Sequence, residues 1–132
     1  MNNRRSFIVG IKSVKLSLKE KRFIQKYKPW GIILFKRNIK SIKQSKKLTN
    51  DIRKIFKDDK YPILIDQEGG RVNRLENIIS LDNFTSEFFG KKYLKDQIKF
   101  KILFKLFIDK TSYLLNAIGV NINTVPVLDL RV

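Results

Sequence analysis

The chain has 132 residues and a formal net charge of +17, and it contains neither cysteine nor histidine. This length indicates one small domain, and 42% hydrophobic with 11% aromatic residues are enough to build a core, which excludes a generally disordered protein. The lack of cysteine excludes a disulfide framework and a thiolate metal site, and the lack of histidine removes the commonest general base and metal ligand.

The positive charge is concentrated in the first half of the chain. Residues 1–60 carry 19 basic and 4 acidic side chains, whereas residues 61–132 carry 10 and 8. The excess is mostly lysine, and it is spread over the outer faces of the expected helices without forming one run. This pattern favours a solvated lysine surface over a nucleic-acid site, so no nucleic-acid partner is expected.

The N-terminal half alternates between predicted strands and helices. Residues 7–11 form an apolar run that predicts a first strand. Ser17 and Glu20 have the spacing of a capping box, so a helix is expected from there to about Lys28. Residues 31–35, GIILF, form a second run that is apolar throughout, as parallel strands covered on both faces tend to be.

The second half continues the same alternation. Ser41 can cap a helix whose apolar residues recur at helical spacing, namely Leu48, Ile52, Ile55 and Phe56. Residues 63–65 predict a third strand, residues 96–118 a long apolar helix that Gly119 ends, and residues 121–128 a fourth strand. Alternation of this kind predicts an α/β fold with parallel strands joined by helices.

No segment indicates a membrane span or an export signal. The longest apolar stretches are shorter than the ~18 residues that a spanning helix needs. The pair Arg4-Arg5 resembles a twin-arginine signal, but the apolar run after it is too short for one. Residues 99–107, KFKILFKLF, fit either a basic amphipathic anchor or a crossover helix facing the core, and we favour the crossover helix because apolar residues occupy most of its circumference. A cytoplasmic protein is expected.

A dense polar cluster, DQEGGRVNR, follows the third predicted strand at residues 66–74. In parallel α/β folds, the loops at the carboxyl ends of the strands carry the chemistry. Asp66 is the first residue after the strand, and its carboxylate can accept two hydroxyl hydrogen bonds at once, which suits a sugar ring. Arg74 offers a planar fork of donors. The glycines at 69 and 70 allow a positive φ and a close backbone approach.

A structural interpretation of the same loop stays open. Asp66 or Glu68 could pair with Arg71 or Arg74 and serve only to hold the loop. The cluster therefore predicts either a sugar-binding loop or a structural ion pair.

Three stretches in this order resemble a known family: residues 31–38 (GIILFKRN), 65–74 (IDQEGGRVNR) and 119–129 (GVNINTVPVLD). The second resembles the VDQEGGRVxR motif of glycoside hydrolase family 3, in particular its bacterial β-N-acetylglucosaminidases of cell-wall recycling. The resemblance implies a TIM-barrel catalytic domain that hydrolyses terminal β-linked N-acetylglucosamine with retention of configuration. The implied substrate is a small sugar or muropeptide, and no metal or cofactor is implied.

The resemblance also assigns residues. Asp66 and Arg74 match sugar-contacting positions of the family. The other conspicuous residues are expected to be structural: Glu68, Gly69, Gly70 and Arg71 within the loop, and Arg37 and Asp129 at the barrel rim.

A complete barrel takes about 250 residues and eight strand–helix units. Residues 1–132 supply about four units, so we expect a partial catalytic domain, the N-terminal part of the barrel. The family's aspartate nucleophile and histidine acid/base belong to motifs that do not occur in this sequence, so we expect no catalytic residue here and no independent turnover. The alternative function is a non-catalytic basic α/β module that binds a polyanion or a sugar through residues 66–74.

Overall fold

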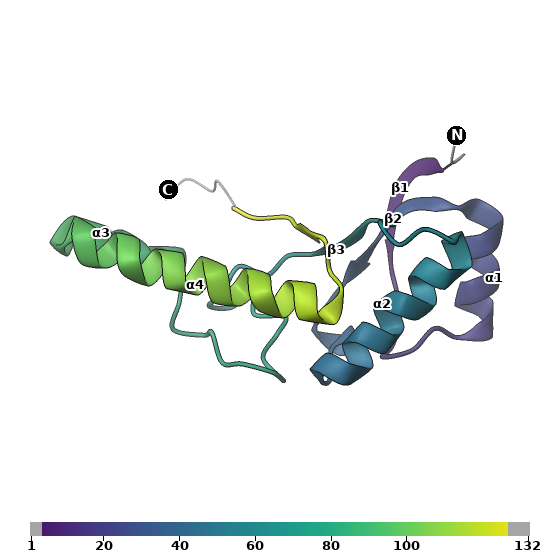
Figure 1. The fold of residues 1–132 in the computed structure, drawn as a ribbon, viewed down its shortest axis with the longest axis horizontal. Helices are drawn as coiled ribbons and strands as arrows, with labels where there is room; N and C mark the ends of the chain where they lie inside the picture. The colour runs from purple at the N-terminus through teal and green to yellow at the C-terminus, as the bar shows by residue number, and fades with distance from the viewer. Residues whose placement is uncertain (1–3, 127–132) are drawn as a thin grey trace.

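The computed structural model describes residues 4–126 as a parallel four-stranded sheet with helical connections (Figure 1). The strands lie side by side in chain order: β1 (Arg5–Gly10), β2 (Pro29–Leu34), β3 (Ile63–Ile65) and β4 (Ile122–Asn123). All three pairings are parallel. The predicted α/β fold is confirmed.

The helices are α1 (Leu18–Tyr27), α2 (Ile42–Phe56), α3 (Ser86–Lys95) and α4 (Gln97–Ile118), with a short 3₁₀ turn η1 (Lys36–Asn38). The predicted capping box of α1 is present, since the Ser17 hydroxyl accepts from the Glu20 amide and the Glu20 carboxylate accepts from the Ser17 amide. Ser41 caps α2 through the amide of Gln44, as predicted.

Gly119 ends α4, as the sequence predicts, and its environment explains the glycine. Its φ is 82°, and a Cβ atom there would lie 2.4 Å from the Thr49 hydroxyl oxygen. That hydroxyl donates a 2.8 Å hydrogen bond to the carbonyl of Ile118, so it also satisfies one of the free carbonyls at the helix end. The end of α4 is thereby tied to the middle of α2.

One apolar core lies between the sheet and three of the helices. It includes Ile32 and Ile63 from the strands, Ile24 from α1, Ile52 from α2 and Ile118 from α4, all buried. Because these side chains form one cluster, α1, α2 and α4 cover the same face of the sheet. The helices do not cover the carboxyl ends of the strands, so the loops that follow these ends lie at one edge of the sheet.

Two elements differ from the sequence prediction. Helix α3 was not predicted, although Thr85 caps it by accepting a 3.0 Å hydrogen bond from the Phe88 amide. The fourth strand is shorter than residues 121–128, because it pairs only with Leu64 and Ile65 of the three-residue β3. Residues 127 and 128 lie outside the described residues.

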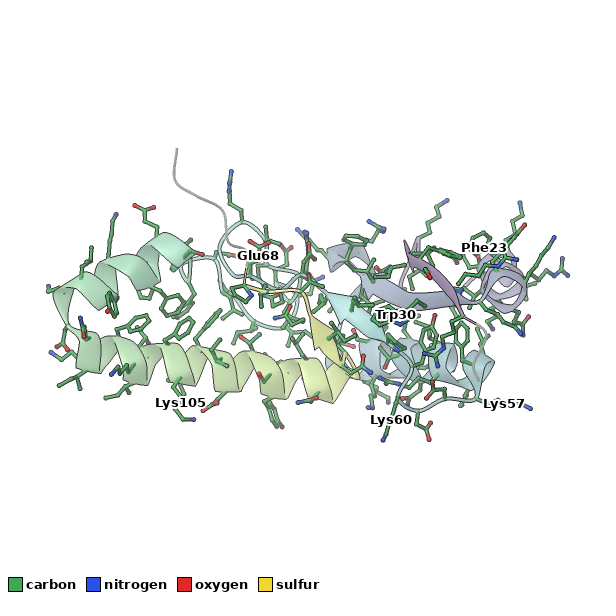
Figure 2. The ribbon with its side chains drawn as sticks, turned by 90° about the horizontal axis from the view of Figure 1, so that it is seen from above. Phe23, Trp30, Lys57, Lys60, Glu68 and Lys105 are labelled. Carbon is green, nitrogen blue, oxygen red and sulfur yellow. The ribbon has the colours of Figure 1, made fainter. Side chains whose placement is uncertain are left out.

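Helices α3 and α4 form a hairpin that extends beyond the sheet (Figures 1 and 2). The C-terminal part of α4 joins the core through Leu114, Leu115 and Ile118. Residues 99–107 were predicted to face the core, but the sheet does not reach this far, and the phenylalanines of this segment pack instead against Phe89 of α3. Among the described residues, no helix is long and apolar enough to cross a membrane.

Candidate functional site

The loop after β3 brings Asp66 and Arg74 into contact. Asp66 follows the last residue of β3, and the Arg74 side chain folds back onto it. The Nε atom of Arg74 donates to Oδ1 of Asp66 at 2.8 Å, and Nη2 donates to Oδ2 at 2.6 Å, so the pair is bidentate. The two side chains remain 27% and 25% exposed. The pair lowers the pKa of Asp66 and raises that of Arg74.

Two glycines make the reversal of this loop possible. The amides of Glu68 and Gly69 both donate to the carbonyl of Val72, and the Val72 amide donates back to Gly69. Gly69 has a φ of 93° and Gly70 a φ of 57°, both in the region that L-residues rarely adopt. A Cβ atom at Gly69 would lie 2.4 Å from the carbonyl oxygen of Phe84, so no other residue fits without a shift.

Gln67 holds the loop from inside. Its side chain is buried, and its Oε1 atom accepts from the amides of Arg74 at 2.8 Å and Leu75 at 3.0 Å. Its own backbone amide and carbonyl are both bonded by the Asn123 side chain of β4, at 3.0 and 3.2 Å. Gln67 and Asn123 therefore set the distance between Asp66 and Arg74. The sequence analysis assigned no role to either residue. The signal that could have identified Gln67 was its polar amide side chain close to the fully apolar strand at residues 63–65.

The end of β2 supplies the neighbouring side chains. The Phe35 ring lies near two guanidinium groups, 4.4 Å from that of Arg37 and 5.7 Å from that of Arg74. Arg37 donates from Nε to the carbonyl of Ile11, consistent with the structural role expected for it. Buried Asn38 donates to the same carbonyl and accepts from the Phe35 amide, so it fixes the turn that carries the ring.

The remaining predicted residues have separate places. Arg71 is exposed, Glu68 is half-buried, and within residues 4–126 neither forms an ion pair. Of the pairings left open by the sequence, the structure forms the one between Asp66 and Arg74. Asp129 lies outside the described residues.

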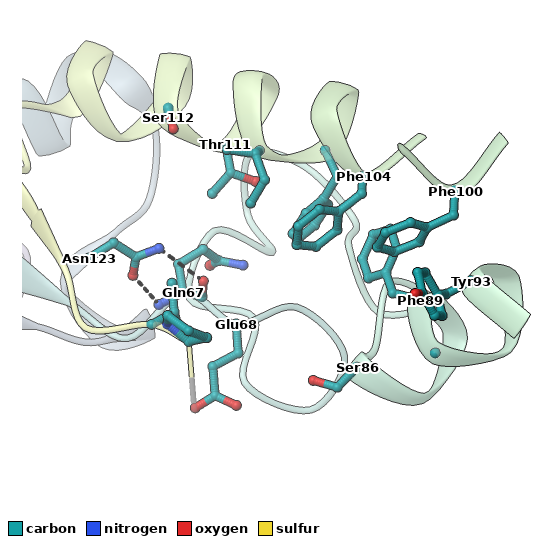
Figure 3. A pocket seen from close by; sticks show the side chains of 15 residues that line it. Gln67, Glu68, Ser86, Phe89, Tyr93, Phe100, Phe104, Thr111, Ser112 and Asn123 are labelled. Atoms are coloured by element: carbon teal, nitrogen blue, oxygen red, sulfur yellow. Dashed lines mark hydrogen bonds between the residues drawn. The ribbon is translucent and has the colours of Figure 1, made fainter. Parts of the chain in front are cut away.

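A cavity of about 720 Å³ lies between this loop and the α3–α4 hairpin (Figure 3). Aromatic residues form one wall: Phe89, Tyr93, Phe100, Phe104 and Phe107. Gln67, Glu68 and Asn123 lie across from them. Two buried polar atoms of lining residues, Nε2 of Gln67 and Oγ1 of Thr111, have no hydrogen-bond partner among the described residues. In the same part of the chain, no group of three or more His, Cys, Asp or Glu side chains could hold a metal ion.

The chemistry of Asp66 favours binding over proton transfer. A carboxylate has about four acceptor positions, and Arg74 uses two of them, so two remain for hydroxyl groups. A general acid needs a raised pKa, whereas the pair with Arg74 lowers the pKa of Asp66. The arrangement is suited to accepting hydrogen bonds from a polyol.

Comparison with curated proteins identifies relatives over most of the chain. No protein-family model matches the sequence. A β-hexosaminidase of Xanthomonas axonopodis pv. citri is 32% identical over 126 residues, which are 93% of this chain and 36% of that protein. A β-hexosaminidase of Thioalkalivibrio sulfidiphilus is 28% identical over 127 residues. The chain thus spans little more than a third of the length of the curated relatives that it matches.

Solved structures give the same result. NagZ from Neisseria gonorrhoeae in complex with N-trifluoroacetyl-D-glucosamine matches with a TM-score of 0.84 and 30% identity over 96% of this chain and 38% of that chain. A glycoside hydrolase family 3 β-N-acetylglucosaminidase from Paenibacillus sp. str. FPU-7 matches with a TM-score of 0.61 and 25% identity over 91% of this chain and 22% of that chain.

Proposed function

Because the chain belongs to glycoside hydrolase family 3, as the N-terminal part of its barrel domain, we propose that it supplies one sugar-binding edge of a β-N-acetylhexosaminidase. The reaction of the whole enzyme is hydrolysis of terminal, non-reducing β-linked N-acetylglucosamine with retention of configuration. Its substrates are muropeptides, and its place is cell-wall recycling in the cytoplasm.

The observation that carries the proposal is the bidentate Asp66–Arg74 pair at the carboxyl end of β3. Arg74 holds the carboxylate charged and in a fixed orientation, and the two free acceptor positions of Asp66 can bind two neighbouring ring hydroxyls. Arg74 keeps donors on Nη1 for a ring or hydroxyl oxygen of the same sugar.

In this proposal the residues of the chain bind and orient the sugar but do not cleave the glycosidic bond. A retaining glycosidase needs a nucleophilic carboxylate and an acid/base group about 5 Å away. The family resemblance assigns both to motifs other than those found in this sequence. Binding is therefore the property by which the chain itself is tested.

The test is binding of N-acetylglucosamine to the 132-residue protein, measured by saturation-transfer-difference NMR. We expect Asp66→Ala to weaken binding by roughly tenfold or more, because hydrogen bonds to a charged group contribute about 1.5–3 kcal/mol. Asp109→Ala is the matched control, since it also removes an aspartate from an ion pair, on the exposed side of α4. Binding that is unchanged in Asp66→Ala would contradict the assignment.

The polyanion alternative has a distinct signature in the same protein. Three exposed lysines of α2 form no ion pair among the described residues: Lys43, Lys46 and Lys54. If the chain is a basic binding module, changing them to glutamine weakens salt-dependent binding of polyphosphate, while Asp66→Ala has no effect. The opposite sensitivity supports the sugar site.

A further inference from the structure

Helix α4 has two apolar faces, of which only one is packed. On the packed face, Phe100 and Phe104 contact Phe89 of α3. On the opposite face, four large apolar side chains are between 64% and 75% exposed: Ile98, Ile102, Leu106 and Tyr113. At 3.6 residues per turn these four fall within an arc of about 80° on the helix. We call them the outer stripe of α4.

Lysines border the outer stripe on both sides. From the helical period, Lys101 and Lys105 lie along one edge, and Lys99 and Lys110 lie along the other. Figure 2 shows Lys105 pointing away from the hairpin partner α3. The only acidic residue of α4 is Asp109, which falls within the arc of the stripe between Leu106 and Tyr113 and pairs with Lys105 at 2.5 Å. Lys99 pairs with Asp96 at the start of the helix. From Ile98 to Leu106 the stripe is therefore an apolar strip with lysines on both sides, and one carboxylate interrupts it before Tyr113.

The tip of the hairpin has the same character. Leu94 of α3 is 85% exposed, and the lysines beside it are Lys91, Lys92 and Lys95. Residues 86–118 carry 7 lysines against 3 acidic residues. The first half of α4 lies beyond the end of the sheet, so the strands do not cover it (Figure 1).

We propose that the outer stripe of α4 docks the protein on an anionic lipid surface. A helix with an apolar face framed by lysines lies in the plane of a membrane interface, where its apolar side chains enter the boundary between headgroups and acyl chains. The lysine stems can extend along the stripe while their ammonium groups reach the anionic headgroups. The proposal does not depend on the sugar site.

The charge of the lysines beside the stripe decides between this partner and a second copy of the chain. Two copies that meet through their outer stripes would bring lysines of one copy close to lysines of the other, and like charges oppose that contact. An anionic bilayer is complementary to both parts of the surface, since it offers apolar depth beneath negative charge.

The first experiment is co-sedimentation of the 132-residue protein with phosphatidylcholine vesicles that contain phosphatidylglycerol, compared with pure phosphatidylcholine vesicles. We expect roughly tenfold or greater preference for the anionic vesicles, which decreases as salt is added. Equal binding to both compositions, or no binding to either, would overturn the proposal.

Two sets of substitutions separate the contributions. The triple variant Ile98→Ser, Ile102→Ser, Leu106→Ser removes the apolar strip at exposed positions, and we expect it to lose vesicle binding while its circular dichroism stays unchanged. Replacing Lys99, Lys101 and Lys110 with glutamine should weaken binding to anionic vesicles to a similar degree.

The matched control removes three exposed lysines of α2, Lys43, Lys46 and Lys54, and should retain binding within about twofold, because that helix exposes no such strip. An equal loss in the control would show that net charge alone causes the binding.

A direct readout comes from Tyr113→Trp, which places an indole within the stripe. Its emission should shift to shorter wavelength on anionic vesicles, compared with the protein in buffer, because the ring leaves water.

Analytical ultracentrifugation of the wild-type protein tests whether a second copy of the chain covers the stripe instead. A dimer that the triple serine variant abolishes, together with no emission shift on vesicles, would assign the stripe to a second copy and reject the lipid partner.

Discussion

Helices α2 and α4 are both rich in lysine and in apolar residues, but they use them differently. In α2 the apolar side chains form one stripe, which includes Leu48 and Ile52 and is buried against the sheet, while the lysines face water. In the first half of α4 apolar residues surround the helix, and the face opposite the α3 aromatics stays exposed. Composition alone does not distinguish the two helices, because the difference lies in whether a packing partner is present on each face.

The same contrast holds for the way each region is stabilised. The sheet and its helices share one mainly aliphatic core, whereas the hairpin is joined by aromatic contacts such as the edge-to-face pair of Phe89 and Phe104, with 4.9 Å between ring centroids. Regions with fewer buried apolar contacts open at lower free energy. We therefore expect amides of α3 and of the first half of α4 to exchange with solvent faster than those of α2.

The largest expected effect is in the core. Ile52 is fully buried, and Ile52→Ala should lower the free energy of unfolding by about 2–5 kcal/mol, since it removes apolar contacts and leaves a cavity. Leu106→Ala on the outer stripe should change it by less than about 0.5 kcal/mol, because the side chain is exposed. Urea denaturation measures both. Similar losses for the two variants would mean that the outer stripe is buried in solution.

The next effect is at the loop glycine. Gly69→Ala should lower the unfolding free energy by about 1–3 kcal/mol, because its φ of 93° is strained for alanine and the new Cβ meets the Phe84 carbonyl. It should also weaken N-acetylglucosamine binding, since the loop positions Asp66. Thermal unfolding and the NMR assay measure the two consequences, and an alanine variant with wild-type values for both would reject this account of the turn.

A glycine of the hairpin should respond in the opposite direction. Gly90 lies inside α3, and a Cβ atom there would meet no atom within 4 Å. Gly90→Ala should therefore stabilise the helix by about 0.5–1 kcal/mol, because alanine loses less backbone entropy on folding. Far-ultraviolet circular dichroism should show more helix. A loss of helix in this variant would indicate that the cavity beside Gly90 is filled by another group.

The smallest effect concerns pH. Asp66 has a pKa lowered by its hydrogen bonds with Arg74, so the folded state binds its proton less readily than the unfolded state does. The pair then contributes about 0.5 kcal/mol above the unfolded pKa of about 3.9, and this contribution is lost as the pH falls through the folded pKa. Asp66→Asn should reduce the steepness of the stability curve below about pH 4. An identical acid limb in this variant would show that the pair does not act on folding.

Features specified by neighbouring residues could be predicted from the sequence. The capping serines Ser17 and Ser41, the terminating Gly119 and the three apolar strands depend on local patterns, and all are present. The contact between Asp66 and Arg74 was one of the pairings that the sequence left open, and a loop that reverses at two glycines brings it about.

Features that depend on distant parts of the chain could not be predicted. The role of Gln67 requires the position of Asn123, 56 residues later, and the cavity requires the path of the α3–α4 hairpin. Helix α3 was missed because its glycine and three lysines obscure the apolar pattern, and only its cap at Thr85 was readable. The exposed stripe on α4 required knowing which face the aromatic residues of α3 cover.

The short β4 has a consequence for the order of assembly. Asn121 and Asn123 use their side-chain oxygens to accept from the amides of Ile63 and Gln67, so two side chains extend a ladder that the two-residue strand alone could not provide. The loop with Asp66 is thus secured by residues that leave the ribosome more than fifty positions later. Closing so long a loop costs chain entropy, and we expect the site to become rigid only in the last stage of folding, after α4 has docked.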